Sequence, residues 1–134
     1  MQIKNVFRLL DQETAEIESV GICFNHLIDS KSMSFYVIDI YPGKSITARS
    51  HIDGPEIYVI LRGQGMMHSW AATAYAKSSQ LIKRGDTFTV MPGSLHQLEN
   101  NGITKLVLLF ACHPESSGGW PDCYRRITSK GTSI

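Results

Sequence analysis

The fold of this 134-residue chain is decided by residues 43–63, which read GKSITARSHIDGPEIYVILRG. From residue 45 to residue 51, side chains alternate with the period of two that marks a β-strand. The polar members of this alternation share one face, and they are Ser45, Thr47, Arg49 and His51. A turn at residues 53–55 then reverses the chain, and Glu56 begins the next strand. A polar face on a central strand indicates that this face lines a wet or reactive interior.

The same strand-like character extends in both directions from this segment. From residue 22, short runs rich in Val, Ile, Phe, Tyr and Thr alternate with turn residues, which is typical of antiparallel β-structure. Strands are predicted over residues 22–28, 33–41, 45–51, 57–62, 65–72, 87–91, 96–99 and 105–113. The one helix-like pattern covers residues 6–18. We therefore expect an all-β sandwich or closed barrel with little helix, because closure removes the exposed strand edges that promote aggregation.

Composition argues against several classes of partner. With 13 Lys+Arg against 12 Asp+Glu, the formal charge is +1, so neither nucleic acid nor a membrane surface is expected as a partner. The longest apolar run, residues 106–112, is too short to cross a bilayer. The amino terminus lacks the pattern of a signal peptide, and the three cysteines are an odd number at no metal-ligand spacing. These features predict a cytoplasmic protein.

A second segment carries chemistry-bearing residues, and residues 85–100 read GDTFTVMPGSLHQLEN. Together the two segments resemble the two sequence motifs of the cupin family. Eight of the ten fixed positions match at the family's spacing, which makes the resemblance specific: Gly43, His51, Glu56, Gly63, Gly85, Gly93, His96 and Asn100. The departures are Arg49, where the family has a histidine, and Met91, where it has a proline. The resemblance implies a cupin-type antiparallel β-barrel, also called a double-stranded β-helix or jelly roll.

The resemblance also implies a metal site made of His51, Glu56 and His96. The spacing is consistent with this reading, because the turn at residues 53–55 brings His51 and Glu56 together, and His96 begins a strand after the Pro92-Gly93 turn. Two imidazoles and one carboxylate suit a divalent ion such as Fe, Zn, Mn, Ni or Co and leave coordination positions open. We expect one such ion as the cofactor.

Arg49 decides between two readings of this site. A guanidinium stays protonated in proteins and cannot bind a metal ion. In one reading, Arg49 binds the carboxylate or phosphate of an anionic substrate held beside the metal. In the other, it pairs with Glu56 and takes the place of the metal, which would leave a metal-free barrel.

Four further residues are candidates for the site. Tyr58 shares the face of Glu56 by alternation, so it is a candidate for moving a proton, as is His68. Tyr36, on the strand before the first motif, is a candidate for substrate binding. In the tail, Trp120 follows a flexible Ser-Ser-Gly-Gly linker and could cover the barrel mouth.

The predicted organisation is a single cupin domain over residues 1–134, with the barrel at about residues 20–113. Residues 114–134 then form either a lid or a strap on a partner subunit, and a homodimer is expected because small cupins commonly form one. The expected function is that of a metal-dependent enzyme acting on a small, oxygen-rich, anionic metabolite, either sugar-like or a keto acid. Its reaction would be an isomerisation, epimerisation, cyclisation or elimination with the metal as Lewis acid. The alternatives are an Fe(II) dioxygenase and a non-catalytic small-molecule-binding cupin in which Arg49 pairs with Glu56.

Overall fold

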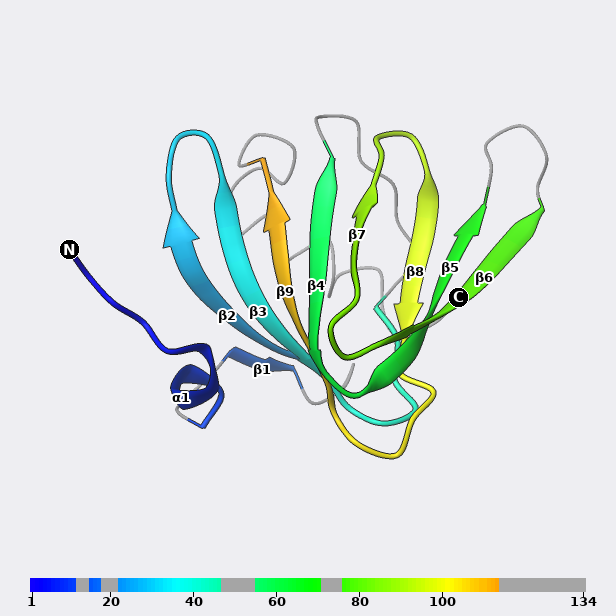
Figure 1. The fold of residues 1–134 in the computed structure, drawn as a ribbon, viewed down its shortest axis with the longest axis horizontal. Coiled ribbons are helices and arrows are strands. Elements are labelled where there is room, and N and C mark those ends of the chain that lie inside the picture. Colours follow the sequence, from blue (N-terminus) through cyan, green and yellow to red (C-terminus); the bar gives the residue numbers. More distant parts are fainter. Residues whose placement is uncertain (12–14, 18–21, 47–54, 71–75, 114–134) are drawn as a thin grey trace.

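The computed structural model describes residues 1–11, 15–17, 22–46, 55–70 and 76–113 (Figure 1). Within these ranges the chain forms one short helix and nine strands, in the order α1 (Val6–Leu10), β1 (Ala15–Ile17), β2 (Ile22–Asp29), β3 (Ser34–Ile40), β4 (Glu56–Arg62), β5 (Gln64–Trp70), β6 (Lys77–Lys83), β7 (Thr87–Val90), β8 (Leu95–Glu99) and β9 (Leu106–Cys112). The described part of the chain is thus almost entirely β-structure, as the turn-rich sequence predicts.

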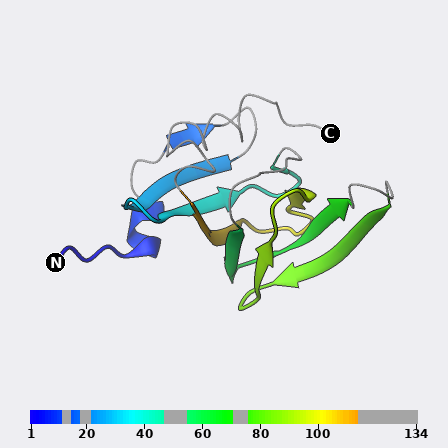
Figure 2. The ribbon, with the colours of Figure 1, turned by 90° about the horizontal axis from the view of Figure 1, so that it is seen from above.

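The strands form two antiparallel sheets. The larger has the order β1-β2-β3-β9-β4-β7, and the smaller has the order β6-β5-β8. The turn at residues 84–86 joins β6 to β7, and the main chain after β3 joins the sheets at the other side, where Ser45 bridges Glu99 and the Ile46 amide donates to the Leu98 carbonyl at 2.9 Å. Figures 1 and 2 show the two sheets facing each other across a common interior.

The alternation of side chains places one apolar cluster between the sheets and another outside the larger one. Tyr36, Ile38 and Ile40 project from β3 into the interior cluster, which β9 completes with Leu106, Leu108 and Phe110. The outer cluster contains Val37 of β3 and Val107 of β9, and residues of α1 pack on it. The central strands β3 and β9 are therefore apolar on both faces, which explains their nearly continuous hydrophobic sequence.

The last glycine of the first motif and the asparagine of the second have structural reasons to be there. Gly63 lies between β4 and β5 at φ +83°, and a Cβ atom at this position would stand 2.6 Å from the Lys105 carbonyl oxygen. Asn100 is completely buried, and its side-chain amide donates to the carbonyls of Ile40 and Thr104 at 2.8 Å each. Both residues stabilise the end of the fold at which β4 and β8 end.

Most of the predicted strands are confirmed within two residues, with three differences. The helix predicted to reach residue 18 ends at Leu10, and residues 15–17 instead form β1, paired with β2. The sequence Lys77–Lys83 was not predicted as a strand because it is polar and mostly exposed, yet it pairs with β5 along its whole length. Of the strand predicted at residues 45–51, Ser45 forms an isolated bridge, and residues 47–51 lie outside the described ranges.

Candidate metal and substrate site

Three polar side chains meet inside the fold where β4 and β8 begin. Glu56 is the first residue of β4 and pairs with Val90 at the end of β7, and a short turn after β7 leads to His96 in β8. Glu56 Oε1 lies 3.0 Å from His96 Nε2 and accepts a hydrogen bond from the Tyr58 hydroxyl at 3.1 Å. All three side chains are buried. Residues 40 positions apart thus form one polar cluster within an apolar interior.

The hydrogen bonds of His96 define which ring nitrogen carries a proton. Nδ1 lies 3.1 Å from the Ser94 carbonyl oxygen, which can only accept, so Nδ1 is the donor. In the neutral ring, Nε2 then carries a lone pair directed at Glu56 Oε1, which is also an acceptor. Two acceptors at this distance are brought together by a proton, carried on the ring or on the carboxyl group, or by a metal ion. A histidine that donates its other nitrogen to a backbone carbonyl is the usual arrangement of a metal ligand.

The geometry also fits a metal ion. Two ligands at about 2.1 Å from an ion and at right angles are roughly 3.0 Å apart, the distance between Glu56 Oε1 and His96 Nε2. The described residues supply these two ligands and contain no group of three or more His, Cys, Asp or Glu side chains that could hold an ion. The expected third ligand, His51, and the substrate anchor Arg49 lie outside the described residues, so the structure does not test either role.

Tyr58 is brought to the Glu56–His96 pair, as alternation along β4 predicts. Its hydroxyl is 3.5 Å from His96 Nε2, and its ring stacks on Phe88 of β7 with centroids 5.0 Å apart. Tyr36 also faces the interior, where it is fully buried and stacks with Phe110 at 5.8 Å. Tyr58 therefore has a rigid ring and a hydroxyl at the candidate site, while Tyr36 belongs to the wall beneath it. Trp120 lies outside the described residues.

The structure does not bring His68 to this cluster. On β5 the flanking residue Ser69 is paired with His96, so His68 projects from the opposite, outer face of the smaller sheet. There His68 Nδ1 lies 2.7 Å from Ser79 Oγ, and Nε2 lies 3.0 Å from Glu99 Oε1. The expectation that His68 moves a proton beside Tyr58 is not met by this geometry, because an odd-even shift along a strand reverses the face.

A cavity of about 430 Å³ adjoins His96, between β6 and β7. It is lined by three kinds of side chain that the sequence did not single out: polar Ser69 and Gln80, apolar Met67, Ile82 and Val90, and aromatic Phe88. Gln80 had no sequence signal, since the strand that carries it was not predicted. The cavity gives His96 an adjoining space in which a small molecule fits.

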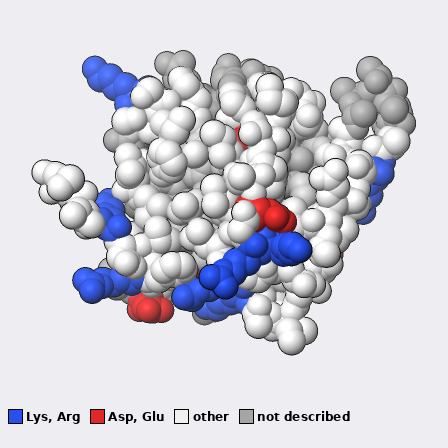
Figure 3. Space-filling model, in the orientation of Figure 1, with Lys and Arg blue, Asp and Glu red and all other residues white. Residues whose placement is uncertain are grey.

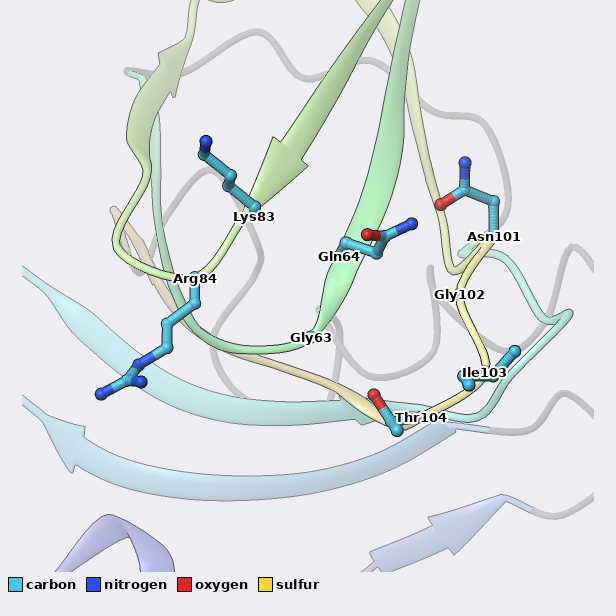
Figure 4. A pocket seen from close by; sticks show the side chains of 8 residues that line it. All are labelled: Gly63, Gln64, Lys83, Arg84, Asn101, Gly102, Ile103 and Thr104. Atoms are coloured by element: carbon cyan, nitrogen blue, oxygen red, sulfur yellow. The ribbon is translucent and has the colours of Figure 1, made fainter.

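Other cavities lie away from this cluster. One of about 410 Å³ lies at the opposite end of β4, between Gly63, Lys83, Arg84 and Asn101 (Figure 4). Figure 4 shows the Lys83 and Arg84 side chains directed away from each other, so they do not converge on a ligand. Figure 3 shows Lys and Arg gathered along the lower edge of one face, next to acidic residues, while the upper part of that face is mostly uncharged. No helix in the described part of the chain is long and apolar enough to span a membrane.

Two curated relatives resemble this chain in sequence. The oxalate-binding protein of Thermotoga maritima is 30% identical over 94 residues, which is 70% of this chain and 73% of the relative. An uncharacterised protein of Methanocaldococcus jannaschii is 31% identical over 75 residues, and this match covers 56% of this chain and 55% of the relative.

Solved structures share the fold. Oxalate decarboxylase of Bacillus subtilis superposes with a TM-score of 0.65 and 27% identity, over 78% of this chain and 28% of that chain. The chain therefore spans little more than a quarter of the decarboxylase. Peruvianin-I, a cysteine peptidase from Thevetia peruviana latex, gives a TM-score of 0.67 over 81% of this chain and 69% of its own, but at 15% identity this likeness concerns the fold alone. The cupin family itself matches residues 25–118, so this chain, with its two facing antiparallel sheets and its motif residues Glu56 and His96, belongs to the cupin family.

Proposed function

We propose that this cupin is a metal-dependent enzyme acting on a small, oxygen-rich, anionic metabolite such as a sugar-like compound or a keto acid. The observation that carries the proposal is the pair of acceptors, His96 Nε2 and Glu56 Oε1, held 3.0 Å apart in a buried site. A metal ion between them would satisfy both. The similarity to a protein named for binding oxalate supports an oxygen-rich anion as ligand.

The proposed roles follow from the positions of the side chains. Glu56 and His96 hold the ion, and His51 is proposed as the third ligand. When bound, a divalent ion supplies Lewis acidity toward a carbonyl or hydroxyl oxygen of the substrate. Arg49 is proposed to bind the anionic group, and Tyr58, whose hydroxyl contacts Glu56 Oε1, is proposed to donate or accept a proton. These roles suit isomerisation, epimerisation, cyclisation or elimination.

The first experiment measures the metal content of the purified protein by elemental analysis, before and after chelation. We expect about one equivalent of a divalent ion per chain, removable by the chelator. In the variant Glu56→Gln, which keeps the size of the side chain but loses its charge, the ion should be lost or bound much more weakly. Wild-type protein that takes up no ion after reconstitution with Fe, Zn, Mn, Ni and Co would contradict the proposal.

The second experiment tests Tyr58. In Tyr58→Phe the hydroxyl is lost, whereas the ring that stacks on Phe88 remains. We expect the metal content to stay at the wild-type level and the turnover of a keto-acid substrate to fall by about 100-fold or more, as for the loss of a general acid or base. Turnover is followed by NMR. Unchanged turnover in this variant would remove Tyr58 from the mechanism.

A non-catalytic binding protein is the second candidate function, favoured by the relative from Thermotoga maritima, which is named for binding and not for a reaction. In this case Arg49 would pair with Glu56, and a ligand would bind without metal and remain chemically unchanged. A single NMR experiment on metal-loaded protein with a panel of keto acids and sugar acids distinguishes the two candidate functions. Conversion of any of them supports the enzyme, whereas binding without conversion, equally strong after chelation, supports the binding protein.

A further inference from the structure

The cavity beside His96 is large for the smallest dicarboxylates. Its volume is about 430 Å³. Oxalate has six non-hydrogen atoms, and even at about 30 Å³ for each, the volume of a water molecule in the liquid, it fills less than half of this space. A two-carbon diacid beside His96 would therefore leave most of the cavity to water.

The chemistry of the lining changes along the cavity. Next to His96, the hydroxyl of Ser69 faces the space, and Gln80 lies on the neighbouring strand β6. Neither side chain hydrogen-bonds to another residue in the described ranges, so both are available to a ligand. Farther along, Met91 lines the cavity while remaining 59% exposed. Together with Phe88 it makes an apolar mouth.

The described lining lacks the positive charges that a dianion would need along its length. Of its side chains, only Asp86 and His96 are ionisable. Asp86 is occupied, because its carboxylate accepts a hydrogen bond from the Lys83 amide at 2.8 Å. A second carboxylate placed in the body of the cavity would thus meet neutral amide, hydroxyl and apolar groups, which do not compensate its desolvation.

We propose that the ligand of this site is an amphipathic monocarboxylate, with its oxygen-rich head beside His96 and a neutral chain extending past Ser69 and Gln80 toward Phe88 and Met91. Gln80 is the specificity-determining residue for a hydroxyl or carbonyl on that chain, and Ser69 limits the width of the passage. This inference rests on the proposed function, since it assigns the substrate class to the same site.

The test uses isothermal titration calorimetry on metal-loaded and chelated protein with oxalate, pyruvate, 2-oxohexanoate and 6-hydroxy-2-oxohexanoate. Because each methylene transferred from water contributes about 0.8 kcal/mol, we expect 2-oxohexanoate to bind at least about 10-fold more tightly than pyruvate or oxalate. In Gln80→Leu, 6-hydroxy-2-oxohexanoate should no longer bind more tightly than 2-oxohexanoate. The matched control, Gln97→Leu, changes the same residue type on the outer face of the smaller sheet, and it should leave the affinities of both compounds at the wild-type values. Ser69→Leu should weaken 2-oxohexanoate but not pyruvate.

Two results would overturn the inference. One is oxalate or pyruvate binding as tightly as 2-oxohexanoate, and the other is affinities in Gln80→Leu and Ser69→Leu that match wild type for every compound. The metal content tests the proposed function separately from these affinities. If the protein binds metal but shows no preference for longer chains, the metal site is supported and the substrate class is wrong. If the protein prefers longer chains but binds no ion, the substrate class is supported and the metal-dependent function is wrong.

Discussion

His96 and His68 each lie 3.0 Å from a glutamate carboxylate, but their surroundings make them chemically different. His68 donates from Nε2 to Glu99 and accepts at Nδ1 from the Ser79 hydroxyl, so the neutral ring satisfies every partner. His96 faces an acceptor on both sides, the Ser94 carbonyl and Glu56. The comparison shows that a histidine–carboxylate contact alone does not define a site, because the partner of the second nitrogen decides whether an additional proton or a metal ion is needed.

Exchanging each histidine for alanine tests this difference most directly. His96→Ala should lower the affinity for the divalent ion by on the order of 100-fold or more, since even the partners of metal ligands are worth about 10- to 100-fold. His68→Ala should retain the wild-type metal content, because its ring lies on the outer face of the smaller sheet. Metal titration of both variants is the measurement. Equal loss of metal in both, with native circular dichroism spectra, would remove the distinction between the two networks.

The outer network should matter for stability instead. His68 links all three strands of the smaller sheet, since Ser79 is on β6 and Glu99 ends β8. Its truncation removes two hydrogen bonds, so the free energy of unfolding of His68→Ala should fall by about 1–3 kcal/mol. Ser79→Ala removes one bond from an exposed position and should cost about 1 kcal/mol or less.

Urea unfolding of the metal-free proteins measures the free energy of unfolding of His68→Ala and Ser79→Ala without a contribution from the ion. If Ser79→Ala cost more than His68→Ala, the histidine would not be the centre of the network.

A second contrast concerns two carboxylates that are buried in the described part of the chain, Glu56 inside the fold and Asp39 on the outer face of β3. Asp39 is 4% exposed, its Oδ1 lacks a hydrogen-bond partner among the described residues, and Lys105 Nζ lies 3.8 Å from Oδ2. Burial raises the pKa of Asp39 above its usual value of 3.8, although Lys105 and Arg62 oppose the shift. Glu56, in contrast, accepts a hydrogen bond from Tyr58.

The raised pKa fixes the sign of a pH effect. Because the folded state binds the proton of Asp39 more tightly than the unfolded state, this carboxyl favours folding most below pH 3.8, and its contribution declines as the pH rises through the folded pKa. Relative to Asp39→Asn, the wild type should therefore lose stability between acidic and neutral pH. Urea unfolding of both proteins at pH 4.5 and pH 7 measures this smallest of the effects. A constant difference between the two proteins at both values would contradict the shift.

Several features were predictable because they depend on short stretches of chain. The alternation from residue 56 onward places Glu56 and Tyr58 on one face, and in the structure the Tyr58 hydroxyl donates a hydrogen bond to Glu56. The motif spacing predicted the cupin fold, which the family match and the two antiparallel sheets confirm. By contrast, the helix predicted to residue 18 ends at Leu10, since residues 15–17 pair with β2.

The sequence by itself determined the fold class and which residues of β4 face inward, because the period of a strand and the demands of tight turns are local properties. Only the tertiary structure decided which face His68 occupies, which acceptors surround His96 and how large the adjoining cavity is. These depend on pairings such as Ser69 with His96 and Glu56 with Val90, which join residues far apart in the chain. The register of such pairs is set by how all the strands pack together, and no single stretch of sequence contains it.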